Sequence, residues 1–502
     1  MYHLERMCVR RGVFAAILAV LLGACAQSKK PAALDHLHAC NGEDGPTDAY
    51  CGTYPVFENR DTRQGRTIDL RLVVLPALSN EPKPDPVFFL AGGPGQGAAE
   101  LARPIKDLFR TLQTDRDIVL VDQRGTGKSR PLNCVVEDDT LQSLNEPESA
   151  TVGLDRLKKC LAGYDADPTL YTTTIAMDDL DDVRGFLGYD AINIYGGSYG
   201  TRAGLVYLRQ HGDRVRAIVL DGVAPTNMRL PLFFARDAQR ALDHLLADCT
   251  VDAGCNAKYP GLNDRLRALF ARLEKAPPHV RLTHPRTGVA EEVNVEATFL
   301  ASIIHAALYS PLIASLLPEL VTRAEHNDFQ GLLALVMLND GAAENMSIGM
   351  QMSVLCAEDF RQIDPADVDK ETAGTVFAKH LVTQHMQVCE FWPKGKVAAS
   401  YYEPVTSDRP ALVLSGEVDP VTPPAWGAAA AAHLSKSTHV VVSNTGHGVI
   451  STGCGLRMVR EFIKAGSVDG LDTRCASTVK RPPFFLTPAG PDPAATSAKA
   501  TP

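Results

Sequence analysis

The sequence lacks features that would place it among several other kinds of protein. No two of its 12 cysteines are spaced as C-x-x-C, which argues against a zinc site and against thioredoxin-type redox chemistry. It has no internal repeat. Its amino-terminal apolar stretch, residues 13–22, is too short to span a bilayer as an anchor. We therefore expect no metal site and no transmembrane anchor.

An excess of basic residues is also missing. The formal net charge at pH 7 is −9. Residues 1–24 hold one Glu and three Arg, a net of +2, so their removal would leave −11. A chain this acidic is repelled by polyanions. We therefore expect no nucleic-acid partner.

The amino terminus predicts export. Two arginines precede the short apolar stretch, as in a signal peptide that covers residues 1–24. Residues 22–25, Leu-Gly-Ala-Cys, resemble a bacterial lipobox, in which the cysteine becomes the lipid-bearing first residue. We expect this lipid on Cys25 to be the only membrane contact, which predicts a lipoprotein of the cell envelope or periplasm. Ordinary cleavage after Ala26 is the alternative and would leave a soluble secreted protein.

Ten cysteines remain in the exported body, an even number for an oxidising compartment. Their order along the chain suggests five local disulfides, although sequence does not prove the connectivity. The suggested pairs are Cys40–Cys51, Cys134–Cys160, Cys249–Cys255, Cys356–Cys389 and Cys454–Cys475.

The most informative stretch is Gly196-Gly197-Ser198-Tyr199-Gly200. A short apolar run at residues 191–195 predicts a buried strand before it, and residues 201–211 predict a helix after it. G-x-S-x-G between a strand and a helix is typical of a nucleophile elbow, a strained turn that exposes the serine hydroxyl. We expect Ser198 to be the nucleophile and the Tyr199 N–H to face the oxyanion. The alternative, an ordinary glycine-serine turn, does not account for the flanking strand and helix.

A possible acid and base follow later in the chain, each after a predicted strand. Asp419 follows the apolar run 411–415, and His447 follows the run 439–442. In α/β folds such strand ends gather on one side of the sheet. Ser198 needs a base to take its proton, and the base needs a carboxylate to orient its ring. We expect His447 and Asp419 in these roles, with Glu417 as the competing acid, although each is also typical of an ordinary loop.

A glycine-rich loop, Ala91-Gly92-Gly93-Pro94-Gly95, directly follows the predicted strand 87–90. Without side chains, its backbone N–H groups can approach a substrate carbonyl. We expect the Gly93 N–H to be the second oxyanion donor, with Gly92 beside it. An ordinary Gly/Pro turn is the alternative.

Strand and helix patterns alternate in the first half of the chain, which predicts a mostly parallel sheet flanked by helices. Residues 225–404 are mainly helical, and we expect them to form a cap domain inserted before the acid strand rather than a separate accessory domain. The expected parts are a signal peptide (1–24), a lead-in (25–50), the first part of the core (51–224), the cap (225–404), the second part of the core (405–480) and a disordered tail (481–502). Strands are expected at 67–75, 87–90, 118–122, 192–195, 217–220, 411–415 and 439–442. Helices are expected at 177–187, 201–211, 235–249, 263–275, 297–308 and 312–326.

Four segments resemble the prolyl iminopeptidase and tripeptidyl aminopeptidase branch of the α/β-hydrolases: residues 92–95, 122–129 (Asp-Gln-Arg-Gly-Thr-Gly-Lys-Ser), 196–201, and 416–424 with 446–448. The likeness covers about residues 50–465, most of the mature chain. It implies an α/β-hydrolase fold and a serine peptidase that needs no cofactor. Prolyl iminopeptidases usually have His where this chain has Ala91, so the likeness shifts towards the secreted tripeptidyl aminopeptidases.

An exopeptidase must recognise a free amino terminus, which requires carboxylates near the site. Glu358 and Asp359 beside Cys356 are the candidates, and the resemblance implies that Glu358 binds the substrate ammonium; a solvated helix end is the alternative. The expected function is that of a secreted serine exopeptidase acting on peptides. A carboxylesterase or lipase on the same fold is the alternative. A non-catalytic binding protein would not need the serine, acid and histidine together.

Overall fold

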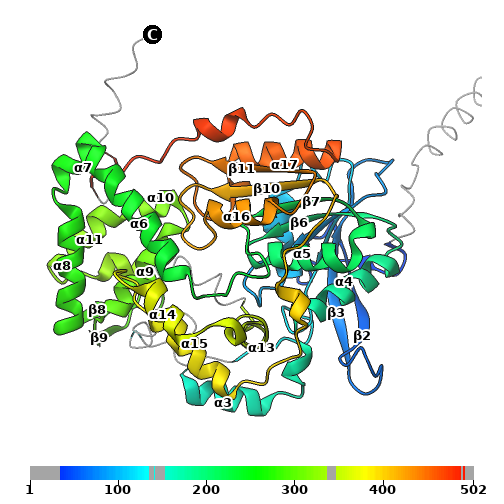
Figure 1. Ribbon diagram of the computed structural model, residues 1–502, viewed down its shortest axis with the longest axis horizontal. Helices are drawn as coiled ribbons and strands as arrows, with labels where there is room; N and C mark the ends of the chain where they lie inside the picture. The colour runs from blue at the N-terminus through cyan, green and yellow to red at the C-terminus, as the bar shows by residue number, and fades with distance from the viewer. Residues whose placement is uncertain (1–33, 135–140, 142–152, 336–345, 488–489, 492–502) are drawn as a thin grey trace, which may run out of the picture.

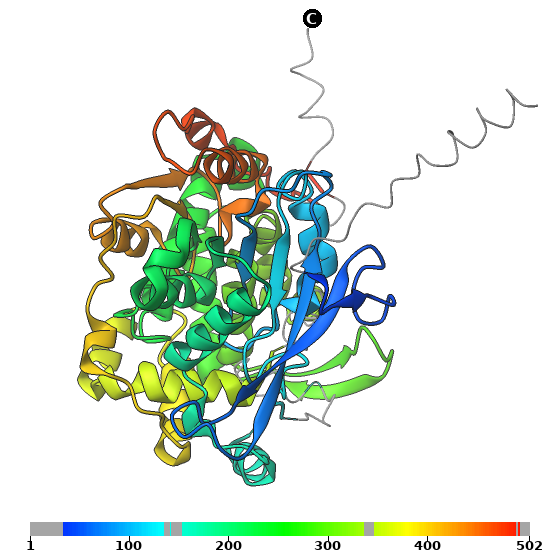
Figure 2. The ribbon, with the colours of Figure 1, turned by 90° about the vertical axis from the view of Figure 1, so that its right-hand side faces the viewer.

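The computed structural model describes residues 34–134, 141, 153–335, 346–487 and 490–491. At its centre is a nine-stranded sheet in the order β1-β2-β3-β5-β4-β6-β7-β10-β11. The strands from β5 to β11 in this order are parallel to one another, while β1, β2 and β3 extend one edge in antiparallel pairs (blue in Figure 2). The strands are β1 (His38–Ala39), β2 (Tyr50–Phe57), β3 (Thr67–Leu75), β4 (Val87–Leu90), β5 (Ile118–Val121), β6 (Ile192–Gly197), β7 (Val215–Asp221), β10 (Ala411–Gly416) and β11 (Ser437–Val442).

The two faces of the sheet have separate hydrophobic cores, because successive strand residues point to opposite sides. Ile194 and Leu220 belong to the core that includes α4 and α5, whereas Tyr195 and Val219 belong to the core that includes α2 and α17. Helices therefore cover both faces, and the expected α/β-hydrolase fold is confirmed. The helices that cover the faces include α2 (Ala102–Leu108), α4 (Thr173–Phe186), α5 (Tyr199–His211) and α17 (Gly453–Ala465). Two further helices outside the cap are α3 (Leu154–Gly163) and α16 (Pro424–Ala431).

The segment between β7 and β10 forms a mostly helical cap beside the sheet, coloured green to yellow in Figure 1. The cap has a core of its own, in which Leu245, Leu269, Ile303 and Val321 pack together from four helices. Its elements are α6 (Phe234–Val251), α7 (Ala253–Lys258), α8 (Leu262–Lys275), β8 (His279–Thr283), β9 (Ala290–Asn294), α9 (Ala297–Leu308), α10 (Pro311–Ala314), α11 (Leu317–Glu325), α13 (Ile348–Glu358), α14 (Pro365–Thr372) and α15 (His380–Phe391).

The cap departs from the expectation in two places. The single helix expected at 312–326 is two helices, α10 and α11. Pro318 explains the break. A proline has no N–H to donate to the carbonyl one turn earlier, so it interrupts the interior of a helix, but it is tolerated in the first turn of a new one. The antiparallel hairpin β8–β9 was not expected, and only one residue of each strand is buried, so its apolar pattern is faint.

The start of the expected tail is packed rather than disordered. Phe484 is 4% exposed and belongs to the cap core, and the Arg481 Nε donates to Asp248 Oδ2 at 2.9 Å. These contacts fix the first residues of the 481–502 segment on the cap. Part of the expected lead-in is also ordered, because β1 and Cys40 join β2.

All five suggested disulfides are present: Cys40–Cys51, Cys134–Cys160, Cys249–Cys255, Cys356–Cys389 and Cys454–Cys475. Within the described residues, no helix is both long and apolar enough to cross a membrane. The expected signal peptide, 1–24, and Cys25 lie outside the described residues.

Candidate active site

Ser198 lies at the tip of the turn between β6 and α5. Its backbone has φ 55° and ψ −125°, a strained conformation for a residue with a side chain. The turn is tight because α5 begins directly against the sheet: a Cβ placed on Gly200 would lie 2.1 Å from the Leu90 carbonyl oxygen. This geometry is that of the expected nucleophile elbow.

Asp419 and His447 lie together on the loops that follow β10 and β11. His447 Nδ1 is 2.8 Å from Asp419 Oδ2, and the Asp419 side chain is fully buried. A carboxylate only accepts hydrogen bonds, so this contact places the proton on Nδ1 and leaves the Nε2 lone pair available. Glu417, the competing acid, instead accepts the Asn444 N–H at 2.9 Å.

The elbow and the histidine loop meet at the end of β7. The Ser198 N–H donates to the Asp221 carbonyl at 2.9 Å. The next residue, Gly222, touches the imidazole: a Cβ there would lie 3.0 Å from His447 Cε1. No hydrogen bond joins the Ser198 hydroxyl to His447 in the part of the chain that the structure describes. Such catalytic hydrogen bonds often tighten only when substrate binds.

Asp419 and His447 shift each other's pKa in opposite directions. Burial opposes charge on His447, but the attraction and the hydrogen bond of Asp419, with a contribution from Asp221, raise the pKa of the ring above its usual value. Burial would raise the pKa of Asp419, yet His447 and the Thr422 and Val421 amides lower it. A buried carboxylate with these partners remains ionised at neutral pH, so it can stabilise an imidazolium.

The two expected oxyanion donors flank the serine. Tyr199 is the first residue of α5, where an N–H has no partner inside the helix. The loop after β4 lies on the other side: a Cβ on Gly92 would be 3.3 Å from the Ser198 Cβ, and Gly93 adopts φ 106°. The structure thus brings Gly92 beside Ser198, the residue before Tyr199, and Gly93 is the next residue of the same loop.

The cap supplies contacts that the sequence patterns did not indicate. The Tyr309 carbonyl accepts the His447 N–H at 2.9 Å, and its ring packs edge-on against the imidazole with centroids 5.1 Å apart. Arg240 on α6 donates to the carbonyls of Glu417 and Asp419 at 2.9 and 2.8 Å. These contacts from the cap link residues more than a hundred positions apart, so no local pattern could have revealed them. Within the acid loop itself, Thr422 Oγ1 donates to Asp419 Oδ2 at 2.8 Å.

Glu358 and Asp359 are fully buried, not solvated at a helix end, and both have protein partners. Asp359 forms an ion pair with Arg202, whose Nη1 lies 2.8 Å from Oδ2. Among the residues that the structure describes, Glu358 accepts only from neutral donors: the Thr173 N–H at 2.6 Å, the Thr173 hydroxyl at 2.8 Å and the Tyr401 hydroxyl. Burial raises the pKa of both carboxyls, against which Arg202 acts.

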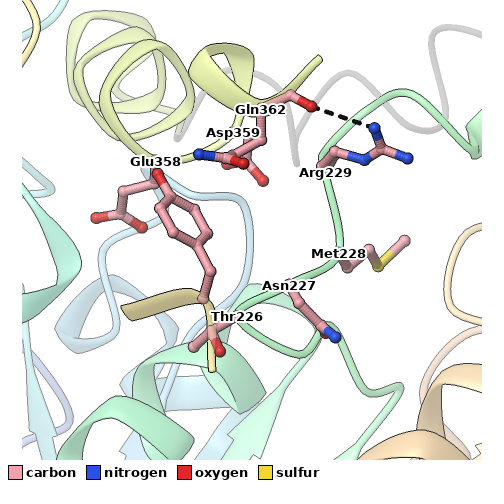
Figure 3. Close-up of a pocket in the computed structure, with 8 residues that line it drawn as sticks. Thr226, Asn227, Met228, Arg229, Glu358, Asp359 and Gln362 are labelled. Carbon is pink, nitrogen blue, oxygen red and sulfur yellow. Dashed lines mark hydrogen bonds between the residues drawn. The ribbon is translucent and has the colours of Figure 1, made fainter. Parts of the chain in front are cut away.

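Both carboxylates line a cavity of about 230 Å³ between α13 and the first segment of the cap (Figure 3). Arg229 also borders this cavity, and its guanidinium pairs with Asp367 at 2.5 Å. Of the three carboxylates named here, Asp359 pairs with Arg202 and Asp367 pairs with Arg229. Within the described residues, Glu358 has no cationic hydrogen-bond partner.

Two protein families match parts of this chain. Residues 85–281 match the family described as alpha/beta hydrolase fold, and residues 374–475 match the family described as TAP-like protein. Serine protease Hip1 of Mycobacterium tuberculosis is 26% identical over 465 residues, 86% of this chain and 88% of that protein. Proline iminopeptidase of Neisseria meningitidis is 33% identical over 147 residues, 29% of this chain and 34% of that protein.

Among solved structures, proline iminopeptidase of Mycobacterium smegmatis aligns with 83% of this chain and 98% of its own length, at 16% identity and a TM-score of 0.39. The two family matches cover the strands and loops that place Ser198, Asp419 and His447. The chain therefore has an α/β-hydrolase fold, and its residues 374–475 are similar to TAP-like proteins.

Proposed function

We propose that the protein is a secreted serine exopeptidase that cleaves peptide bonds near free amino termini. The observation that supports this most strongly is the 2.8 Å contact between His447 and Asp419 beside the strained elbow of Ser198. Relatives named serine protease and proline iminopeptidase favour a peptide rather than an ester as the substrate.

In the proposed reaction, Ser198 Oγ attacks the scissile carbonyl carbon while His447 Nε2 takes the hydroxyl proton. Asp419 stabilises the resulting imidazolium, and the N–H groups of Tyr199 and Gly93 donate to the tetrahedral oxyanion. His447 then gives the proton to the leaving amine, which departs. The leaving amine is the shortened peptide. Water then attacks the acyl-enzyme by the same route and frees the amino-terminal fragment as a carboxylic acid.

For the substrate's amino terminus, we propose Glu358 as the partner. Its carboxylate lines the cavity and has only neutral hydrogen-bond donors, so an ammonium ion would balance its buried charge. Asp359 is less suited, because Arg202 already neutralises it. Glu358→Gln should lower kcat/KM for free peptides by about thirtyfold or more. Activity on an amino-terminally blocked ester should stay unchanged; an equal loss on both substrates would mean that Glu358 only supports the cap.

Turnover of three matched substrates tests the function itself: a free peptide amide, its amino-terminally acetylated form and a nitrophenyl ester. The proposal predicts that the free amide is cleaved faster than the acetylated one, and that Ser198→Ala loses activity on all three substrates. Equal cleavage of the two amides would contradict exopeptidase specificity. Turnover of the ester alone would favour an esterase.

We further propose that the mature chain begins at a lipid-modified Cys25. The sequence supports this through the lipobox-like residues 22–25. Mass spectrometry of the amino-terminal peptide decides it. A diacylglyceryl and acyl mass on Cys25 is the expected result, whereas an unmodified start at Gln27 would indicate a soluble secreted enzyme.

A further inference from the structure

Asp221, the last residue of β7, contacts both halves of the proposed catalytic site. Its backbone carbonyl accepts the Ser198 N–H at 2.9 Å and so holds the elbow. Its side chain, on a residue 1% exposed, accepts the N–H groups of Val449 and Ile450 at 2.8 Å each. These two amides follow His447 by two and three residues. One residue therefore fixes the nucleophile through its backbone and the histidine loop through its carboxylate.

The histidine loop needs this carboxylate because of its own geometry. Gly448 adopts φ 86°, and residues 449–451 then form a single 3-10 turn. The first amides of such a turn have no partner within it. Asp221 Oδ1 accepts the Val449 N–H and Oδ2 accepts the Ile450 N–H. Asp221 thus holds the segment that follows His447, while Asp419 holds Nδ1 of its ring.

The hydrogen bonds of Asp221 suit the ionised form. A third donor, the Tyr195 hydroxyl, reaches Oδ2 at 2.8 Å, so all three side-chain contacts are donated to the carboxylate. Burial raises the pKa of Asp221 and outweighs these donors and the nearby His447, which act in the opposite direction. A carboxylate in this position adds to the attraction that favours a protonated His447.

Other titratable side chains also lie near the imidazole, among them Tyr309, whose ring packs against it. Asp419 contacts Nδ1 directly. His305 on α9 lies close enough for its charge to matter, yet burial, followed by the field of His447, lowers its pKa to about 4. His305 is therefore neutral wherever the enzyme would act. In its ionised form, Asp221 adds a second negative charge near the ring, beside that of Asp419.

Resting on the proposed function, we propose that Asp221 is a positioning residue of the catalytic site: it sets the spacing between Ser198 and His447 and supplies a second negative charge that stabilises the imidazolium. It touches neither substrate nor reacting atoms. This role differs from that of Asp419, which orients the ring through its own hydrogen bond.

Asp221→Asn tests the role, because the amide keeps the shape but offers one acceptor oxygen and no charge. The expected result is a kcat about 10- to 100-fold lower with little change in KM, since a small misplacement of the base slows chemistry without weakening binding. The acid limb of the pH profile of kcat/KM should also move to lower pH, because the ring loses one charge that favours its protonation.

Asp117→Asn is the matched control. Asp117 is also buried and also accepts a tyrosine hydroxyl and a backbone amide, from Tyr189 and Ala77 at 2.7 Å each, but it lies at the amino end of β5. Its variant should lose stability without moving the acid limb. If Asp221→Asn behaves in the same way, Asp221 is merely structural and the proposal is overturned.

Rates of labelling by a fluorophosphonate separate this proposal from the proposed function, since they report activation of Ser198 whatever the natural substrate is. Slower labelling of Asp221→Asn supports the positioning role even if peptides prove not to be substrates. Should the variant not fold, amide exchange in the wild-type protein decides. The Val449 and Ile450 amides must be protected from hydrogen exchange. The protection should be greater in the phosphonate adduct, where His447 is protonated. Exchange at the rates of a free loop in both states would overturn the proposal.

Discussion

At the scale of single residues, the hydrogen bonds of the two candidate carboxylates indicate which of them orients His447. Asp419 accepts from His447, Thr422 and Val421, whereas Glu417 points to the Asn444 amide on the neighbouring loop. Asp419→Asn would present an amide to Nδ1 and favour the wrong tautomer, so kcat should fall by about 10⁴-fold. Steady-state kinetics with Glu417→Gln as the control checks this. A larger loss in the Glu417 variant would identify Glu417 as the acid.

The titration of His447 gives a second residue-scale prediction. Its ring must be neutral to accept the Ser198 proton, and its pKa is raised above the usual value of about 6.5, chiefly by Asp419 once burial is overcome. The activity should therefore fall as the pH drops through a midpoint above 6.5. A pH profile of kcat/KM measures it. A midpoint at or below 6.5 would mean that Asp419 does not stabilise the imidazolium.

At the scale of elements, α6 of the cap braces the acid loop through Arg240, which donates to two of its carbonyls. Arg240→Ala should lower kcat about tenfold or more, because the loop that carries Asp419 would lose two hydrogen bonds. Arg236→Ala is the control, since Arg236 on the same helix pairs with Asp237 and Glu371 instead. Equal kcat in the two variants would show that the cap does not position the acid.

The elements also show what the sequence could predict. Short apolar runs between turn residues predicted β4 and β10 within a residue of their bounds, because a buried parallel strand needs no alternation. The three residues of the proposed triad follow β6, β10 and β11, the strands after which they were predicted. The roles of Tyr309, Arg240 and Asp221 could not be predicted, because they depend on how the cap and β7 pack against loops more than a hundred residues away in the sequence.

At the scale of the whole molecule, a disulfide that closes a longer loop should contribute more to the free energy of unfolding. Cys356–Cys389 spans 33 residues and ties α13, which bears Glu358, to α15, whereas Cys249–Cys255 spans only 6. Chain-entropy arguments give losses in the free energy of unfolding of about 4 and about 2 kcal/mol for the two double Cys→Ala variants. Denaturant unfolding compares them. A larger loss for the short loop would show that strain or local packing, not loop entropy, dominates.

The account as a whole depends on Ser198 being the nucleophile. A fluorophosphonate probe followed by peptide mass spectrometry tests this directly. The account predicts that one peptide is labelled, at Ser198, and that Ser198→Ala is folded and unlabelled and loses turnover by several orders of magnitude. Labelling of another residue, or turnover in Ser198→Ala above about a tenth of the wild-type rate, would contradict it.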